Sequence, residues 1–258
     1  MLRYWTAGES HGPALTALVD GFPAGLVVNT DSIDSELQRR QGGYGRGGRQ
    51  RIETDSVTFL SGLWRGVTLG SPLALEVVNR DAKLERLEDV ERPRPGHADL
   101  AGIMKYGFND IRNVIERSSA RETTMRVALG SICRKFLENL DIYIASYVTQ
   151  IHNIADTTES YAYDVKNINN QADQSDIRIL NSTIEEDMIN AIKKAQKNGD
   201  TVGGQFKVLI SGVPYGLGSY ISWNKKLNAK LAEGICSINA IKGVSFGANN
   251  ASDSLGSQ

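Results

Sequence analysis

The sequence has few of the residues and patterns on which several common classes of protein depend. It contains two cysteines and three histidines among 258 residues, with neither a CxxC pair nor a Cys/His ligand set. A disulfide framework and a metal site are therefore not expected. No apolar run approaches the roughly 18 residues of a membrane span, and the N-terminal "MLRYWTAGE" lacks the apolar core of a signal peptide. These absences predict a cytoplasmic protein.

An excess of charge of one sign is also missing. Lys and Arg number 29 against 30 Asp and Glu, which gives a formal net charge of −1. The protein as a whole is therefore not expected to attract nucleic acid or anionic membranes, and any anion site must be local. With 40% hydrophobic and 23% charged residues, a chain of this length can bury the core of a globular protein.

Apolar patterning predicts a mixture of strands and helices. Apolar and β-branched runs bounded by Gly and Pro predict strands at 2–7, 14–22, 51–62, 71–79, 141–151 and 205–213. Helical spacing predicts helices at 32–39, 97–107, 119–137, 182–198 and 225–239, with N-caps at Asp31, Ser119 and Ser182. Paired strands mixed with long helices favour the α+β class over a regular βαβ alternation.

Two histidines lie in accessible settings. His11 follows Gly8 in "GESHGPALTALVDGFPAGL", directly before a predicted strand, and His97 follows Gly96 in "RPRPGHADL". Histidine on such a turn can donate or accept a proton near neutral pH. For His97, a local capping or surface role is the alternative. His152 ends a predicted strand and is interpreted as structural.

The most unusual stretch is "RRQGGYGRGGRQR", residues 39–51, with five arginines, five glycines and no acidic residue. Planar guanidinium groups on a glycine-rich backbone suit a phosphate or a carboxylate. Two alternatives stay open, a solvated flexible loop and an RGG-type RNA-binding segment. The RNA-binding mode usually needs repeated boxes, and this chain has one.

A second anion site is predicted at "ERSSARETT", residues 116–124, where serines and arginines precede a helix. The free N–H groups at a helix start favour a phosphate, although Ser119 could serve only as a cap. Together with the Arg-Gly stretch and the two histidines, this segment predicts acid–base chemistry on a phosphorylated small molecule. The residue patterns alone do not identify that molecule.

Four long blocks of the sequence are "GESHGPALTALVDGFPAGL", "RRQGGYGRGGRQRIETDSVTFLSGLWRGVTLGSPLALEVVNRD", "RPRPGHADLAGIMKYGFNDIRNVIERSSARETTMRVA", and "GVPYGLGS" with "SINAIKGVSFG". In this order, they resemble the chorismate synthase family. The resemblance covers residues 4–247 and is weak over 155–180. It implies a β-α-β sandwich with long helices between antiparallel sheets, a single domain at 1–247, and a homotetramer.

The resemblance also implies an activity in the shikimate pathway of aromatic amino-acid biosynthesis. The family removes phosphate from 5-enolpyruvylshikimate 3-phosphate by 1,4-anti elimination to give chorismate, and requires reduced FMN. His11 then matches the acid near the departing phosphate, and His97 the residue that protonates or stabilises the reduced flavin. Arg40 and Arg46 match positions that bind anionic substrate or NADPH. The positions that match FMN-binding residues are Arg117, Ser118, Ser119, Asn239 and Ala240.

Family members continue beyond the "KGVSFG" block, where this chain passes into small polar residues at 248–258 that predict an unstructured tail. Relative to the family, the expected fold is therefore incomplete at the C-terminus and lacks a basic FMN-binding segment. Two alternatives to an active lyase stay open. One is an inactive truncated remnant that retains only anion binding or oligomerisation, and the other is an RNA-binding protein that uses residues 39–51.

Overall fold

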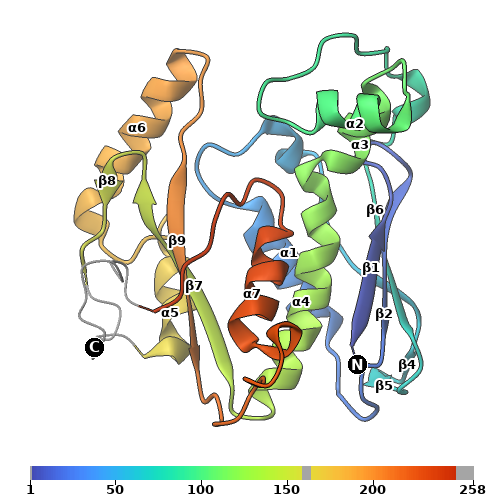
Figure 1. Cartoon of the computed structure of the whole chain (residues 1–258), viewed down its shortest axis with the longest axis vertical. Helices are drawn as coiled ribbons and strands as arrows, with labels where there is room; N and C mark the ends of the chain where they lie inside the picture. The colour runs from blue at the N-terminus through green and yellow to red at the C-terminus, as the bar shows by residue number, and fades with distance from the viewer. Residues whose placement is uncertain (1, 159–163, 248–258) are drawn as a thin grey trace. The chain divides into compact units, whose positions relative to one another are not determined.

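The computed structural model describes residues 2–158 and 164–247 of the chain (Figure 1). The tail expected at 248–258 lies outside the described residues. The chain divides into two compact units, Met1–Gly212 and Val213–Gln258. The expectation that residues 1–247 form one domain stays a prediction.

The first unit contains an antiparallel sheet of four strands in the order β1-β2-β6-β3. Alternation along β2 and β6 places Leu15, Val19 and Leu75 on one buried face, as expected for a sheet that packs against helices. A separate short hairpin pairs β4 with β5. The strands are β1 (Arg3–Ala7), β2 (Ala14–Asp20), β3 (Thr58–Ser61), β4 (Leu63–Trp64), β5 (Val67–Thr68) and β6 (Leu73–Val78).

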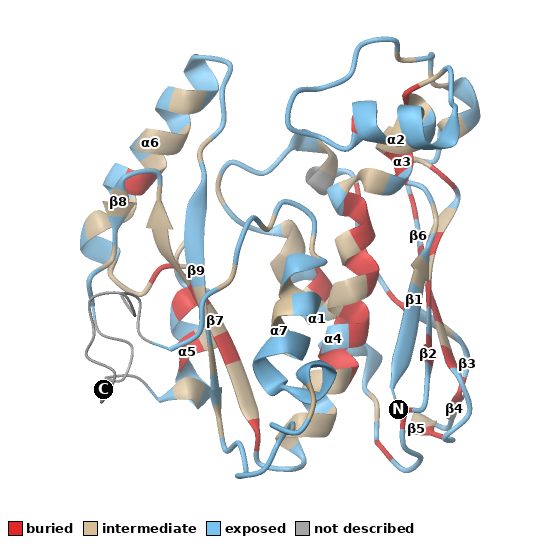
Figure 2. Cartoon of the chain, in the orientation of Figure 1, coloured by how far each residue is buried: buried red, intermediate tan, exposed pale blue. Residues whose placement is uncertain are grey.

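Two helices, α1 (Thr30–Gln41) and α4 (Thr123–Glu138), cover the buried face of this sheet. Leu37 of α1 and Met125 of α4 are fully buried and join the sheet residues in one hydrophobic core. Figure 2 shows the buried positions running along α4 and the facing strands. The apolar stripe predicted for residues 119–137 is therefore what holds α4 against the sheet.

A second antiparallel sheet has the order β8-β7-β9. Helix α4 contacts β2 and β6 of the first sheet and β7 of the second, so α1 and α4 lie between the two sheets (Figure 1). Helix α5 packs Ile168 against Tyr147 of β7, and α6 buries Met188 beside Ile179. The elements are β7 (Tyr143–Ile151), β8 (Ile154–Ala155), α5 (Val165–Ala172), α6 (Glu185–Lys197) and β9 (Gly204–Ser211).

Two short helices and four 3₁₀ turns complete the described part of the first unit, and residues 213–247, the described part of the second unit, contain one turn and one helix. In the first unit these are η1 (Gly48–Arg51), η2 (Leu84–Arg86), α2 (Asp99–Tyr106), α3 (Arg112–Ser118), η3 (Ala120–Glu122) and η5 (Ser182–Ile184). In the second they are η6 (Trp223–Lys225) and α7 (Leu227–Cys236). No helix among the described residues is both long and apolar enough to cross a membrane.

The expected α+β class is confirmed, but two predicted N-caps and the first part of one predicted strand are wrong. Asn29, not Asp31, caps α1, because its side chain accepts a hydrogen bond from the Asp31 N–H at 2.9 Å. Asn181, not Ser182, caps the turn before α6 in the same way. Residues 51–57 are not a strand, because Glu53 and Asp55 are buried there as ionic partners of arginines.

Gly8 shapes the turn that leads from β1 to His11. Its φ is +104°, and an added Cβ would lie 2.5 Å from the carbonyl oxygen of Ala14. We expect Gly8→Ala to lower the free energy of unfolding by about 2–3 kcal/mol, from backbone strain plus overpacking. Gly25→Ala is the control, because φ is +89° there but nothing lies within 4 Å. Equal losses for the two variants in urea unfolding would contradict the steric argument.

Candidate active site

His11 is held by Glu116, which lies 105 residues away in the sequence on α3. Nδ1 of the imidazole lies 3.0 Å from both carboxylate oxygens, and the His11 main-chain N–H donates to the same carboxylate at 2.8 Å. The Ser10 N–H donates to the Glu116 main-chain oxygen at 3.0 Å. The Glu116 side chain is 2% exposed and that of His11 19%. The turn thus fixes the ring and leaves part of it accessible.

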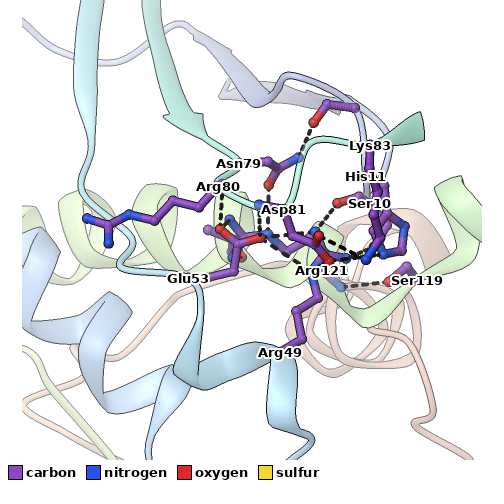
Figure 3. A network of polar contacts seen from close by, with 12 residues as sticks. Ser10, His11, Arg49, Glu53, Asn79, Arg80, Asp81, Lys83, Ser119 and Arg121 are labelled. Carbon is purple, nitrogen blue, oxygen red and sulfur yellow. Dashed lines mark hydrogen bonds and ion pairs between the residues drawn. The ribbon is translucent and has the colours of Figure 1, made fainter. Parts of the chain in front are cut away.

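Arg49 and Asp81 lie on the other side of the imidazole (Figure 3). Nη1 of Arg49 is 3.3 Å from Nε2 of His11, and Asp81 Oδ2 is 3.7 Å from the same nitrogen. Arg49 also donates hydrogen bonds to the hydroxyl and the carbonyl oxygen of Ser10. A hydrogen bond from Lys83 holds the pKa of Asp81 below its usual range, against the opposing effect of burial. Nε2 therefore faces a group of fixed charges.

A buried ionic layer lies next to this turn (Figure 3). Arg121 donates to Asn79 Oδ1 at 2.9 Å and to Asp55 at 2.8 Å, and its Nη2 lies 3.5 Å from Glu53. Glu53 also pairs with Arg49 at 3.1 Å. Burial alone would raise the pKa of Glu53, but a main-chain hydrogen bond and the charge of Arg121 lower it overall. The layer thus favours the ionised form of Glu53 and connects Arg121 to the histidine turn.

The Arg-Gly stretch, 39–51, contributes its arginines to different places. Arg40 donates to the Thr123 hydroxyl at 2.9 Å and to the Ala120 carbonyl at 2.8 Å, which ties the end of α1 to the start of α4. Burial lowers the pKa of Arg40 to about 10, although Asp55 opposes the shift. Arg46 is exposed. Ligand binding by Arg40 and Arg46 stays a prediction.

Arg117 lies at the end of α3, beside the end of β1. Its guanidinium donates to the carbonyl oxygens of Thr6 at 2.6 Å and Gly8 at 3.1 Å. Ser118 ends the helix, and the Ser119 hydroxyl accepts a hydrogen bond from the Arg121 N–H at 3.2 Å. The structure therefore gives Ser119 the capping role that the sequence offered as one alternative.

Two of the residues predicted to bind FMN line one cavity. The cavity has a volume of about 210 Å³ and is lined by Arg117, Ser118, Asn113 and Val114 together with Tyr106 and Phe108. The two aromatic rings stack with centroids 5.7 Å apart. A guanidinium, a hydroxyl and aromatic faces therefore meet at one place.

The structure does not link His97 to His11. His97 is exposed in the loop before α2, and its Nδ1 lies 3.1 Å from the Pro95 carbonyl oxygen. Neither histidine lines the 210 Å³ cavity, nor a larger one of about 560 Å³ beside α6 and the adjoining ends of β7 and β9. Asn239 and Ala240 follow α7 in the second unit. The roles predicted for His97, Asn239 and Ala240 stay predictions.

Sequence reasoning missed several residues of the site. Glu116 stands inside the quoted segment 116–124, but the pattern gave it no role. Arg121 was counted there among the arginines of an anion site, whereas the structure pairs it with Asp55 and Glu53. Glu53 and Asp55 were assigned to a strand, although two acids in an apolar stretch are a signal of buried ion pairs.

Among the described residues, no group of three or more His, Cys, Asp or Glu could hold a metal ion.

This geometry suits proton transfer to an anion. A carboxylate can only accept hydrogen bonds, so Glu116 accepts a hydrogen bond from Nδ1–H of His11 and leaves Nε2 for chemistry. The adjacent guanidinium of Arg49 provides a positive charge at 3.3 Å from Nε2. An anionic group that reached Nε2 would therefore meet a proton donor and a cation together.

Comparison with known proteins matches the chain to one family model and to relatives that carry the same description. A family model described as chorismate synthase matches residues 2–258. The chain is 49% identical over 260 residues to chorismate synthase of Enterococcus faecalis (strain ATCC 700802 / V583), covering 95% of this chain and 67% of that protein. It is 50% identical over 261 residues to chorismate synthase of Streptococcus mutans serotype c (strain ATCC 700610 / UA159), with the same coverage.

A solved structure titled "Crystal Structure of Chorismate Synthase" superposes with a TM-score of 0.83 at 38% identity, covering 99% of this chain and 72% of that one. The fold and the resemblance expected from the sequence blocks are confirmed, and no observation favours an inactive remnant. The chain belongs to the chorismate synthase family, whose members are carbon–oxygen lyases of aromatic amino-acid biosynthesis.

Proposed function

We propose that this chain converts 5-enolpyruvylshikimate 3-phosphate into chorismate and phosphate by 1,4-anti elimination, with reduced FMN as its cofactor. The observation that carries the proposal is the setting of His11. Its Nδ1 lies 3.0 Å from the buried carboxylate of Glu116, and its Nε2 lies 3.3 Å from Nη1 of Arg49. The family relation supplies the identity of the substrate.

His11 is the residue that assists the departing phosphate. Breaking the carbon–oxygen bond places negative charge on the phosphate oxygens, and a proton donor or a cation near them lowers the barrier. Protonated His11 provides a donor at Nε2, and Arg49 provides the cation beside it. Glu116, at 3.0 Å from Nδ1 on the opposite side of the ring, keeps Nε2 turned toward this space.

The residues around the 210 Å³ cavity fit part of a flavin. Bound reduced FMN supplies electron density to a reaction that has no net redox change. Arg117 and Ser118 offer donors for polar groups of the cofactor, and the stacked Tyr106 and Phe108 offer an apolar wall. The cavity is smaller than the roughly 300–1,000 Å³ of whole ligand sites, so it would hold one portion of FMN.

The remaining site assignments rest on the family resemblance. Ser119, Asn239 and Ala240 are proposed to bind FMN, and His97 to protonate or stabilise the reduced flavin. Arg46 is proposed to bind anionic substrate or NADPH through its exposed guanidinium. Arg40 is proposed to support the same site, mainly through its positive charge.

We further propose a cytoplasmic homotetramer. The outer face of the first sheet carries apolar side chains in adjacent strands, and Trp5 of β1 pairs in register with Leu18 of β2. Trp5 is 55% exposed, Leu18 40% and Leu60 of β3 59%. A second copy of the chain that covered this face would remove the apolar patch from water.

The test is anaerobic phosphate release from 5-enolpyruvylshikimate 3-phosphate in the presence of reduced FMN. We expect His11→Ala to lower kcat at least about 100-fold while reduced FMN still binds, because proton donation typically contributes 10²–10⁴-fold. His152→Asn is the matched control, because His152 is exposed with a φ of +55° that asparagine tolerates. Full activity of His11→Ala, or no phosphate release by the wild-type chain, would refute the proposal.

A further inference from the structure

We infer that Glu116 is a positioning residue for the reaction, which holds the imidazole of His11 with its Nδ1 proton toward the buried carboxylate. Nε2 is thereby the nitrogen presented to the leaving group. The inference rests on the proposed function, since positioning matters only where His11 takes part in the elimination.

Glu116 fixes both the backbone and the ring of the histidine turn. One carboxylate oxygen accepts the His11 main-chain N–H at 2.8 Å, and both oxygens lie 3.0 Å from Nδ1. The main-chain oxygen of Glu116 also accepts the Ser10 N–H at 3.0 Å. A ring that could otherwise rotate about two side-chain bonds is thus kept in one orientation.

The carboxylate also selects the tautomer of the neutral ring. An ionised carboxylate has no proton to donate, so a lone pair on Nδ1 would face negative charge at 3.0 Å. With the proton on Nδ1, Nε2 carries the lone pair and accepts from Arg49 Nη1 at 3.3 Å. The two neighbours therefore favour the same tautomer from opposite sides of the ring.

The charged groups around the ring come from three elements. Helix α3 contributes Glu116 and Arg112, whose Nη1 lies 3.8 Å from the Glu116 carboxylate. The turn η1 contributes Arg49, and the segment after β6 contributes Asp81 with its partner Lys83. Among these, Glu116 is the negative charge closest to the imidazole and the most deeply buried. It is therefore the group whose removal should most change the orientation and the tautomer of the His11 ring.

Glu116→Gln keeps the size of the side chain and removes its charge. The glutamine amide can donate to Nδ1, so the other neutral tautomer, with the proton on Nε2, becomes possible. We expect kcat to fall about 10²–10⁴-fold, the usual contribution of a positioned general acid, with KM changed less than about threefold, because the ring no longer keeps its proton on Nδ1.

Glu122→Gln is the matched control for kinetics. Glu122 is also buried, but its carboxylate pairs with Arg126 at 3.0 Å and accepts from the Thr6 hydroxyl at 2.7 Å. Its replacement should leave the tautomer of His11 as in the wild type. Glu116→Asp is the conservative variant, and it should recover part of the lost kcat because it restores the charge.

Nitrogen-15 NMR of the imidazoles reads the tautomer without any catalytic assay. The chain has three histidines, so the His11 signals can be assigned by their loss in His11→Gln. We expect the proton on Nδ1 in the wild type and in Glu116→Asp, and a shift toward Nε2 in Glu116→Gln. This readout still decides the inference if Glu116→Gln is too unstable for kinetics, since the wild type and Glu116→Asp alone reveal the tautomer.

Two outcomes would overturn the inference. One is a wild-type His11 whose neutral ring carries its proton on Nε2, and the other is an unchanged tautomer in Glu116→Gln. Failure of the proposed function looks different. In that case, the Nδ1 proton would be present as expected, but His11→Ala would release phosphate as fast as the wild type.

Discussion

Replacement of Arg121 by methionine is expected to lower the free energy of unfolding by about 3–5 kcal/mol, the cost of breaking a buried ionic network. Arg121 has a side chain that is 5% exposed and lies between Asp55 at 2.8 Å and Glu53 at 3.5 Å. It also donates to Asn79 at 2.9 Å. Methionine fills similar space but leaves both carboxylates without their cation. Denaturant unfolding at neutral pH measures the loss.

An exposed ion pair on α4, the helix that follows the turn containing Arg121, provides the control. Lys135 is 54% exposed and pairs with Glu138 at 3.7 Å, so Lys135→Met should change stability by less than about 1 kcal/mol. A comparable loss for the two variants would show that the buried network contributes nothing beyond a surface pair.

The effect of Arg121→Met should also depend on pH. In the wild type, burial would raise the pKa of Glu53, but its hydrogen bonds and the charge of Arg121 lower it overall. Ionised Glu53 therefore contributes stability above its ordinary pKa of about 4.3, and this is lost as pH falls through the lower folded value. Without Arg121, one cause of the lowered pKa of Glu53 is lost. The variant therefore loses less stability on acidification, and its difference from the wild type should shrink below about pH 5. A constant difference between pH 7 and pH 4 would contradict this account.

The fold could be predicted wherever one element shows its own periodicity. The apolar run at 14–22, bounded by Gly and Pro, identified β2, and the wide apolar stripe of α4 identified the helix that packs on it. Helix α3 lacked such a signal, because it is seven residues long and buries the charged Glu116. Residues 51–57 were misassigned because tertiary ion pairs, not a sheet ladder, bury Glu53 and Asp55.

The site could be predicted only as far as its parts are local. The glycine-flanked His11 and the Arg-Gly stretch were visible in short segments. The partner Glu116, which lies 105 residues away, requires the path of β1 and α3 in space. The sequence also could not rank the arginines of the stretch, although Arg40 contacts the start of α4 and Arg49 contacts the histidine turn.

Arg49→Met is expected to lower kcat/KM for phosphate release about 10³-fold, the upper part of the range for loss of one charge-stabilising donor. Arg49 bonds both the hydroxyl and the carbonyl oxygen of Ser10, and its guanidinium lies 3.3 Å from His11 Nε2. The substitution therefore removes the cation nearest the proposed proton donor and loosens the turn that presents it. Steady-state kinetics with reduced FMN measure the effect.

Two further variants separate charge from position. Arg49→Lys keeps the charge, but one ammonium group cannot reproduce the forked contacts to Ser10 and Glu53, so we expect less than about tenfold recovery. Arg80→Met is the control, because its exposed side chain points away from the histidine turn while its main-chain N–H binds Glu53 (Figure 3). If Arg80→Met were as damaging as Arg49→Met, the general positive charge of the region would explain the activity. Full recovery by lysine would mean that charge near His11 suffices without the fork that holds Ser10.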